Sequence, residues 1–168
     1  MDSLRLRPLR LADEAAVVAG QRGMADDDFI FALDYQPGMP WHRYLRLLEG
    51  QRRGDDLPEG WVRSSFLVAE AGGHLVGRTS IRHGLTERLK LQGGHIGYGV
   101  LPQYRRRGYA TEILRQSVII ARSLGVDRVL VTCEDSNVGS AAVIERCGGR
   151  LDSVIETGGR KIRRYWID

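Results

Sequence analysis

The spacing of apolar and polar residues predicts a mixed order of strands and helices along the chain. Period-two or continuous apolar runs predict strands at residues 4–9, 66–70, 75–81, 95–101, 128–133, 151–157 and 161–167. Apolar residues at helical spacing predict helices at residues 12–24, 41–51, 108–124 and 137–147, with a polar connection at 84–94. Because no repeat or linker interrupts this order, we expect one α+β domain over residues 1–168.

Composition narrows the class of protein. With 42% hydrophobic and 27% charged residues the chain can bury a core. Its two cysteines, Cys133 and Cys147, and four histidines form no Cys-x-x-Cys or His-Glu-x-x-His pattern, so we expect no metal site and no disulfide framework. The charged start and the short apolar run at 118–121 predict a cytoplasmic protein without a membrane partner. The net charge of +4 permits a nucleic-acid partner, but no recognition motif supports one.

A basic segment stands directly before the best predicted helix. Arg105, Arg106 and Arg107 precede Gly108 at a helix N-terminus, where the helix dipole already places about half a unit of positive charge. Cations there are mildly unfavourable unless an anion binds to the free N–H groups of the first turn. A solvated basic loop would explain the same residues, so charge alone leaves both readings open.

Other phosphate-binding motifs do not fit. The pattern Gly-x-x-x-x-Gly-Lys-Ser/Thr is absent, which excludes a P-loop. Gly97 and Gly99 begin like a dinucleotide fingerprint, but Pro102 occupies the position of the third glycine. A nucleotide therefore has to be held in another way.

The segment Arg105-x-x-Gly108-x-Ala110, which follows a strand and Pro102 and opens a long helix, resembles the pyrophosphate loop of the GNAT acetyltransferases. A second stretch, Asn137-x-x-Ser140 after a strand, matches the same superfamily, and the order of elements agrees over essentially the whole chain. The stretches 93–98, 143–149 and 164–167 resemble a bacterial branch of predicted acetyltransferases with no assigned acceptor.

The resemblance implies a fold and a co-substrate. It implies a twisted, mostly antiparallel sheet of about seven strands flanked by about four helices, with a V-shaped splay between the strands at 95–101 and 128–133. It also implies acetyl-CoA as acetyl donor and a primary amine, on a small molecule or a protein, as acceptor. A homodimer stays open.

The resemblance places the cofactor residue by residue. Backbone groups of Val100 and Leu101 would bond the pantetheine amides, and Asn137 would meet the pantetheine side. The pyrophosphate loop would consist of Arg105, Arg106, Arg107, Gly108, Tyr109, Ala110 and Thr111.

The sequence leaves alternatives for the catalytic groups. Many GNAT enzymes carry a tyrosine, which protonates the leaving thiolate, where this chain has Ile144. Ser140 is the nearest substitute, although its hydroxyl could equally bond to Asn137 or to backbone, and Tyr98 is a second candidate. His95 could accept the proton of the amine, or it could be a hydrogen-bonded strand histidine that faces away.

Two functions follow from this reading. The first is an N-acetyltransferase that works by direct attack in a ternary complex, because neither cysteine has a nucleophilic setting. The alternative is a catalytically idle GNAT-fold sensor or regulatory module that binds acyl-CoA, which the missing tyrosine at position 144 favours.

Overall fold

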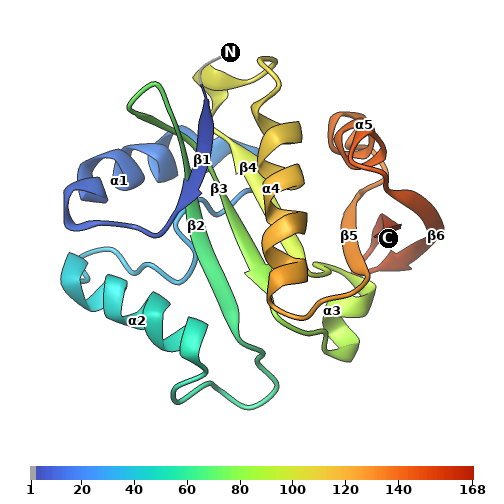
Figure 1. Ribbon diagram of the computed structural model, residues 1–168, viewed down its shortest axis with the longest axis horizontal. Coiled ribbons are helices and arrows are strands. Elements are labelled where there is room, and N and C mark those ends of the chain that lie inside the picture. Colours follow the sequence, from blue (N-terminus) through green and yellow to red (C-terminus); the bar gives the residue numbers. More distant parts are fainter. Residues whose placement is uncertain (1–2) are drawn as a thin grey trace.

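The computed structural model describes residues 3–168 and contains two sheets with helices between and around them (Figure 1). The strands are β1 (Leu4–Arg7), β2 (Ser64–Ala71), β3 (His74–Arg82), β4 (Ile96–Val100), β5 (Val129–Glu134), β6 (Arg150–Thr157) and β7 (Arg160–Ile167). The helices are α1 (Glu14–Gly23), α2 (Trp41–Arg53), α3 (Glu87–Leu91), α4 (Tyr109–Ser123) and α5 (Val138–Arg146). Three 3₁₀ turns complete the chain, at Leu11–Asp13, Ala25–Asp27 and Pro102–Tyr104.

The first sheet is antiparallel, in the order β1-β2-β3-β4, and it is covered on both faces. Successive side chains of a strand point to opposite faces, and β2 shows this alternation directly. Phe66 and Val68 belong to the cluster that includes residues of α1 and α2. Ala69 and Ala71 belong to the cluster that includes residues of α4. The sheet is therefore held between α1 and α2 on one face and α4 on the other.

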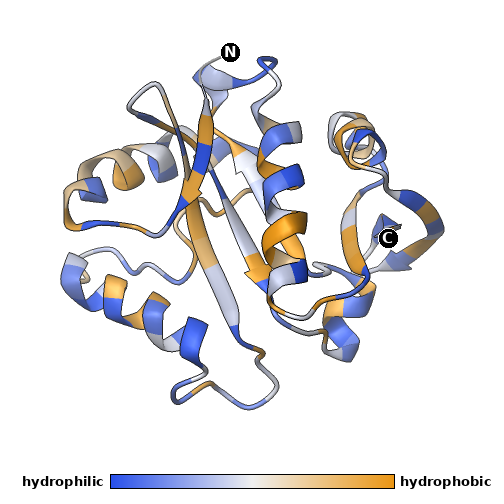
Figure 2. Cartoon of the chain, in the orientation of Figure 1, coloured by the Kyte–Doolittle hydropathy of each residue, from blue (hydrophilic) through white to orange (hydrophobic). Residues whose placement is uncertain are grey.

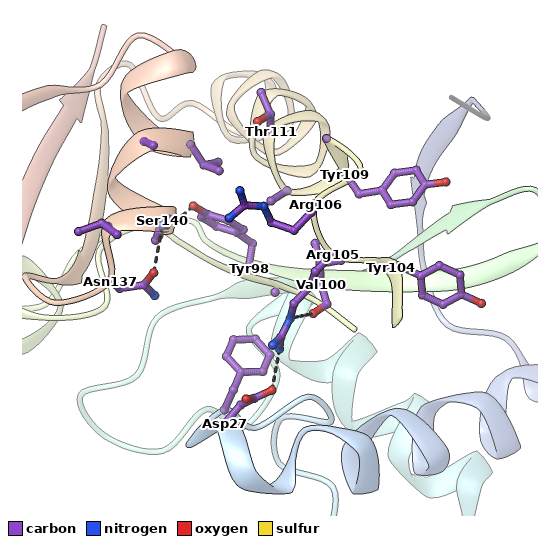
Figure 3. Close-up of a pocket in the computed structure, with 18 of the residues that line it drawn as sticks. Asp27, Tyr98, Val100, Tyr104, Arg105, Arg106, Tyr109, Thr111, Asn137 and Ser140 are labelled. Atoms are coloured by element: carbon purple, nitrogen blue, oxygen red, sulfur yellow. Dashed lines mark hydrogen bonds and ion pairs between the residues drawn. The ribbon is translucent and has the colours of Figure 1, made fainter. Parts of the chain in front are cut away.

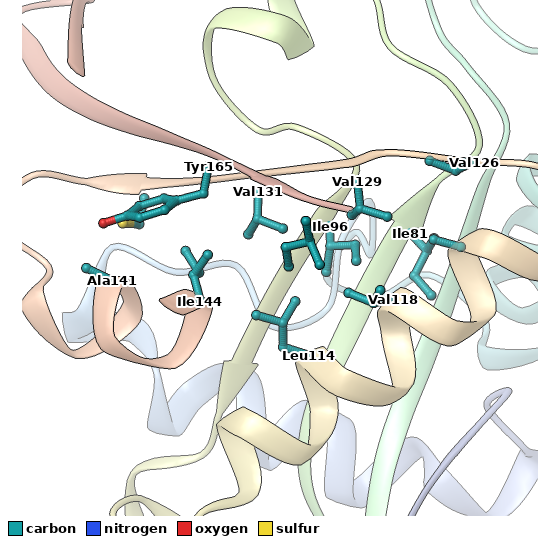
Figure 4. Close-up of a cluster of buried hydrophobic side chains, with 13 residues drawn as sticks. Ile81, Ile96, Leu114, Val118, Val126, Val129, Val131, Ala141, Ile144 and Tyr165 are labelled. Carbon is teal, nitrogen blue, oxygen red and sulfur yellow. The ribbon is translucent and has the colours of Figure 1, made fainter. Parts of the chain in front are cut away.

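The second sheet, in the order β5-β7-β6, is also antiparallel and packs against α4 and α5. Its core joins it to the first sheet, because Val129 and Val131 of β5 share a buried cluster with Ile96 of β4 and Leu114 of α4 (Figure 4). The two longest helices, α2 and α4, are amphipathic, and Figure 2 shows both hydrophilic and hydrophobic residues along each of them. No helix between residues 3 and 168 is long and apolar enough to cross a membrane.

The fold class predicted from the sequence is confirmed, with two refinements. The expected single sheet is divided into four and three strands. The segment 84–94, predicted as a polar connection, contains the short helix α3, which Thr86 caps by accepting a hydrogen bond from the Leu89 N–H at 3.2 Å. A five-residue helix gives too short an apolar period to be recognised in the sequence.

Candidate active site

Strands β4 and β5 meet at one end and separate at the other. The backbone N–H of His95 donates to the carbonyl of Leu130 at 2.8 Å, at the start of both strands. Between residues 3 and 168 no ladder of backbone hydrogen bonds joins the two strands beyond this point, and they belong to different sheets. The chain thus forms the V-shaped opening that the sequence led us to expect.

The open edge of β4 presents backbone hydrogen-bonding groups to this gap. Leu101, directly after β4, donates its N–H to Val76 O at 2.9 Å, and His95, directly before β4, accepts from the Arg82 N–H at 2.7 Å. In this register the odd-numbered residues of β4, Gly97 and Gly99, direct their backbone groups to β3. Hydrogen-bonded and non-hydrogen-bonded pairs alternate in an antiparallel ladder. Tyr98 and Val100 therefore turn their N–H and C=O groups toward the opening, where an extended ligand with amide groups can bond to them.

A cavity of about 760 Å³ occupies the opening (Figure 3). This volume lies within the range of small-molecule sites. Its walls come from β4, the loop before α4, the first turn of α4, the face of α5 and the turn after α1. The lining includes Met24, Asp27, Phe29, Tyr98, Gly99, Val100, Tyr104, Arg105, Arg106, Gly108, Tyr109, Ala110, Thr111, Asn137, Val138, Gly139, Ser140, Ala142, Val143 and Arg146.

The loop before α4 is shaped to hold an anion. Arg106 has φ 61° and Gly108, the N-cap residue, has φ 83°. No side chain caps α4, so the N–H groups of Tyr109, Ala110 and Thr111 have no capping partner, and all three residues line the cavity. Successive N–H groups and the positive end of the helix dipole converge on one point of the cavity, which is a suitable place for a phosphate group.

The three arginines of this loop do different things. Arg105 turns away from the helix end, because its Nε donates to Val100 O at 3.1 Å and its guanidinium pairs with Asp27 at 2.6 Å. The guanidinium of Arg107 lies 5.7 Å from the centre of the Tyr104 ring, and Arg107 does not line the cavity. Arg106 does line it, as does Arg146 of α5. Arg106 and Arg146 are therefore the cations best placed for a phosphorylated ligand.

Helix α5 supplies polar groups to the other wall. Asn137 is its N-cap, and the Asn137 side-chain oxygen accepts from the Ser140 N–H at 3.0 Å. The Ser140 hydroxyl lies 3.0 Å from the Tyr98 hydroxyl of β4, so these two side chains bridge the opening (Figure 3). Burial raises the pKa of Tyr98 above its ordinary value, partly offset by the bond to Ser140. Both hydroxyls are thus protonated at neutral pH and available as hydrogen-bond donors.

Ile144 and the cysteines have structural surroundings. Ile144 is fully buried in the cluster between α5, β5 and α4, where no solvent or ligand reaches it (Figure 4). Burial raises the pKa of Cys133 and of Cys147 above the ordinary thiol value. Both thiols are therefore protonated at neutral pH, which disfavours them as nucleophiles.

Most of the site residues proposed from the sequence lie around this one cavity, and three do not. Val100, Arg105, Arg106, Asn137, Ser140 and the residues 108–111 line it, whereas Leu101, Arg107 and His95 do not. The Leu101 N–H is already bonded to Val76, so it is not free for a pantetheine amide. His95 is 6% exposed, and its ring Nδ1 accepts from the Leu130 N–H at 2.9 Å, away from the cavity.

Sequence reasoning missed several lining residues. Asp27 and Phe29 reach the cavity from the segment after α1, and no local pattern links them to it. Asp27 pairs with Arg105, which lies 78 positions later in the chain. Arg146 had a weak signal, because it follows Asn137 and Ser140 on the same predicted helix. Among residues 3–168 no group of three histidine, cysteine, aspartate or glutamate residues could hold a metal ion.

Comparisons with known proteins identify a family and similar folds. The family model described as an acetyltransferase (GNAT) domain matches residues 3–150. Mycobacterium smegmatis RimJ, solved with CoA-disulfide, is 22% identical with a TM-score of 0.72 over 98% of this chain and 81% of that one. The yncA protein of Salmonella typhimurium, solved with its cofactor acetyl-CoA, is 15% identical with a TM-score of 0.66 over 99% and 94%.

A third solved structure has a named acceptor. A chimera of spermidine N-acetyltransferase SpeG from Vibrio cholerae and hSSAT is 13% identical to this chain, with a TM-score of 0.61 over 98% and 94% of the two chains. No curated protein matches the sequence significantly. The family match covers most of the chain, and the cavity has the features that a CoA thioester needs. The chain is therefore a member of the GNAT acetyltransferase family.

Proposed function

We propose that the whole chain acts as one N-acetyltransferase, which transfers the acetyl group of acetyl-CoA to a primary amine by direct attack in a ternary complex. One observation carries the proposal. The free edge of β4 and the uncapped first turn of α4 face the same cavity. The first suits the amides of a pantetheine arm, and the second suits a pyrophosphate.

The cavity suggests how acetyl-CoA would lie. The pyrophosphate would accept hydrogen bonds from the N–H groups of residues 108–111, with Arg106 and Arg146 adding charge. The pantetheine would run along Val100 and Tyr98, with Asn137 on its other side. Arg105 already donates to Val100 O, so the amide of the ligand would use the Val100 N–H or displace that contact. The thioester would then lie near the Tyr98 and Ser140 hydroxyls.

The reaction needs little from the protein beyond positioning the amine against the acetyl carbonyl. The neutral amine attacks the acetyl carbonyl carbon, the carbon–sulfur bond breaks, and CoA leaves as a thiolate. Backbone N–H groups on the open edge of β4 would stabilise the charge that develops on the carbonyl oxygen. A thiol has a pKa of about 8.5, so its thiolate can leave without a strong acid. Ser140, supported by Tyr98, would donate a hydrogen bond to the sulfur.

We propose that His95 is not the general base that takes the proton of the amine. Its ring lies outside the cavity with Nδ1 occupied, and burial, with a further effect of Arg82, lowers its pKa to about 4. A base of that strength would be a poor acceptor for an ammonium proton at neutral pH. We propose that the proton of the amine passes to solvent at the mouth of the cavity.

A second function is favoured by one observation. Position 144 of α5, where many GNAT enzymes carry the tyrosine acid, is a fully buried isoleucine in this chain. A module that binds acyl-CoA without turnover would need the cavity and not the acid. The two functions share their ligand and differ only in turnover.

The test is a CoA thiol-release assay with acetyl-CoA and pooled primary amines that include spermidine, amino acids and peptides with a free N-terminus. Calorimetry with CoA on the same preparation reports binding. Binding with release that depends on one amine pool supports the transferase. Binding without release from any pool supports the idle module. Absence of CoA binding contradicts both.

A further inference from the structure

The vertex of the V is built around one residue in an unusual way. The His95 N–H donates to the Leu130 carbonyl at 2.8 Å, and the His95 ring Nδ1 accepts from the Leu130 N–H at 2.9 Å. His95, directly before β4, therefore satisfies both backbone polar groups of one residue of β5. One bond uses the main chain of His95, and the other uses its side chain.

A regular parallel ladder could not be completed at this point. In such a ladder the Leu130 N–H would bond to the carbonyl two residues before His95, which belongs to Gly93. That carbonyl instead accepts from the Arg82 guanidinium at 3.0 Å. The His95 carbonyl is taken by the Arg82 N–H at 2.7 Å. The imidazole nitrogen thus replaces a backbone acceptor, because both nearby carbonyls are already bonded to Arg82.

The surroundings hold the ring and the strand start tightly. The Gly93 N–H donates to the Thr132 hydroxyl of β5 at 3.0 Å. Gly94 has φ 59°, and a Cβ atom there would come within 2.5 Å of the Leu130 carbonyl oxygen. The His95 residue as a whole is 6% exposed. These contacts leave little freedom for β5 to shift along β4 or away from it at the vertex.

We propose that His95 is a positioning residue, whose Nδ1, as the hydrogen-bond acceptor of the Leu130 N–H, holds β5 at the vertex and so fixes the width of the opening between Tyr98 and Ser140. Loss of the acceptor would leave the Leu130 N–H buried without a partner and release β5 at its pivot. For its catalytic consequence the inference rests on the proposed function, but the vertex itself can be tested without ligand.

The chemistry of the ring supports this role. An Nδ1 that accepts a hydrogen bond carries no proton, so the neutral ring holds its proton on Nε2. Burial and the nearby Arg82 cation keep the ring neutral by lowering its pKa. Asparagine offers a matched replacement, because its Oδ1 stands the same number of bonds from the backbone as Nδ1. Asparagine accepts a hydrogen bond but cannot act as a base.

The experiment compares His95→Ala, His95→Asn and the control His42→Asn, which changes an exposed histidine on α2. Amide hydrogen exchange is measured first, without ligand. We expect the Leu130 amide to exchange at least 100-fold faster in His95→Ala. The exchange rate in His95→Asn and in the control should stay within threefold of wild type. Equal protection of Leu130 in all four proteins would overturn the proposal, as would an asparagine variant as unprotected as the alanine variant.

CoA binding and turnover form the second arm. We expect His95→Ala to weaken CoA binding tenfold or more and to lower kcat, with both values restored to within threefold by His95→Asn. A catalytic base would give the opposite result, with CoA binding intact and turnover lost in both variants. That result would overturn the positioning role. If wild type fails to bind CoA, the proposed function fails, while the exchange result still decides the role of His95 at the vertex.

Discussion

The two ends of the β4–β5 pair treat their backbone hydrogen-bonding groups in opposite ways. At the vertex, Leu130 has both its N–H and its C=O bonded to His95. At the open end, Tyr98 and Val100 turn theirs toward a cavity. The first arrangement makes a fixed joint, and the second makes a binding edge. A buried polar group without a partner costs roughly 1–3 kcal/mol, so such an edge persists only where water or a ligand can reach it.

The same contrast holds between the two ends of α4. At its C-terminus, the N–H of the C-cap residue Leu124 bonds to carbonyls of the last turn, and Gly125 lets the chain turn away. At its N-terminus no side chain caps the helix, and Gly108 exposes the first-turn N–H groups to the cavity. The ends differ because one only has to stop the helix, while the other also has to leave its donors free.

The largest expected effect comes from Gly108→Val. A β-branched residue is strained at φ 83°, and its side chain would project where the anion binds. We expect CoA affinity to fall 100-fold or more by calorimetry, with a much smaller fall in Tm. Gly125→Val is the matched control, because φ is 91° there and no atom lies within 4 Å of the added Cβ. Equal loss of CoA affinity in both variants would contradict the placement of the pyrophosphate.

The second effect concerns acid stability of the vertex. The pKa of His95 is lowered to about 4 in the folded chain, first by burial and then by Arg82, against about 6.5 when unfolded. Between these values only the unfolded chain binds the proton, so the free energy of unfolding falls as the pH falls from 6.5 to 4. We expect wild type to lose about 2.5 kcal/mol more than His95→Asn over this range. The measurement is chemical denaturation of both proteins at several pH values, and an equal fall in the free energy of unfolding for the two would refute the prediction.

A smaller effect is expected at the hydroxyl pair that bridges the open end. Because a thiolate leaves readily, Ser140→Ala should lower kcat tenfold or less, about 1.4 kcal/mol. Tyr98→Phe removes the partner hydroxyl at 3.0 Å. If the two act as a unit, the double variant should be no slower than the worse single variant. A loss above 100-fold in Ser140→Ala would instead make protonation of the leaving group essential.

The smallest effect is expected for Arg105→Ala. Its guanidinium is bound to Asp27 and Val100 and points away from the uncapped helix end. Exposed charge pairs contribute about 1 kcal/mol or less, so CoA affinity should fall about fivefold at most. Asp27→Asn removes the same ion pair and keeps Arg105, and it should have a similar small effect. Loss of all measurable binding in Arg105→Ala would show that Arg105 holds the phosphates itself.

Local sequence was enough to predict most of the elements and to locate the loop that we propose binds an anion. Period-two runs located the strands, and the order of strands and helices identified the fold class. The junction of Arg106 and Gly108 with α4 was recognisable because its chemistry comes from consecutive residues. Such features depend on neighbours along the chain, so a single sequence contains all that is needed to predict them.

Tertiary structure decided which groups are free. The sequence suggested His95 as a candidate base, yet its ring Nδ1 accepts a hydrogen bond from the N–H of Leu130, 35 positions away. It could not show that Arg105 would be held by Asp27, or that Tyr98 would meet Ser140 across the opening. Each outcome depends on which partner lies within hydrogen-bonding distance of a polar group in the folded chain. The residues determine what a side chain can donate or accept, and only the packing of distant segments determines whether a ligand or the protein itself takes that bond.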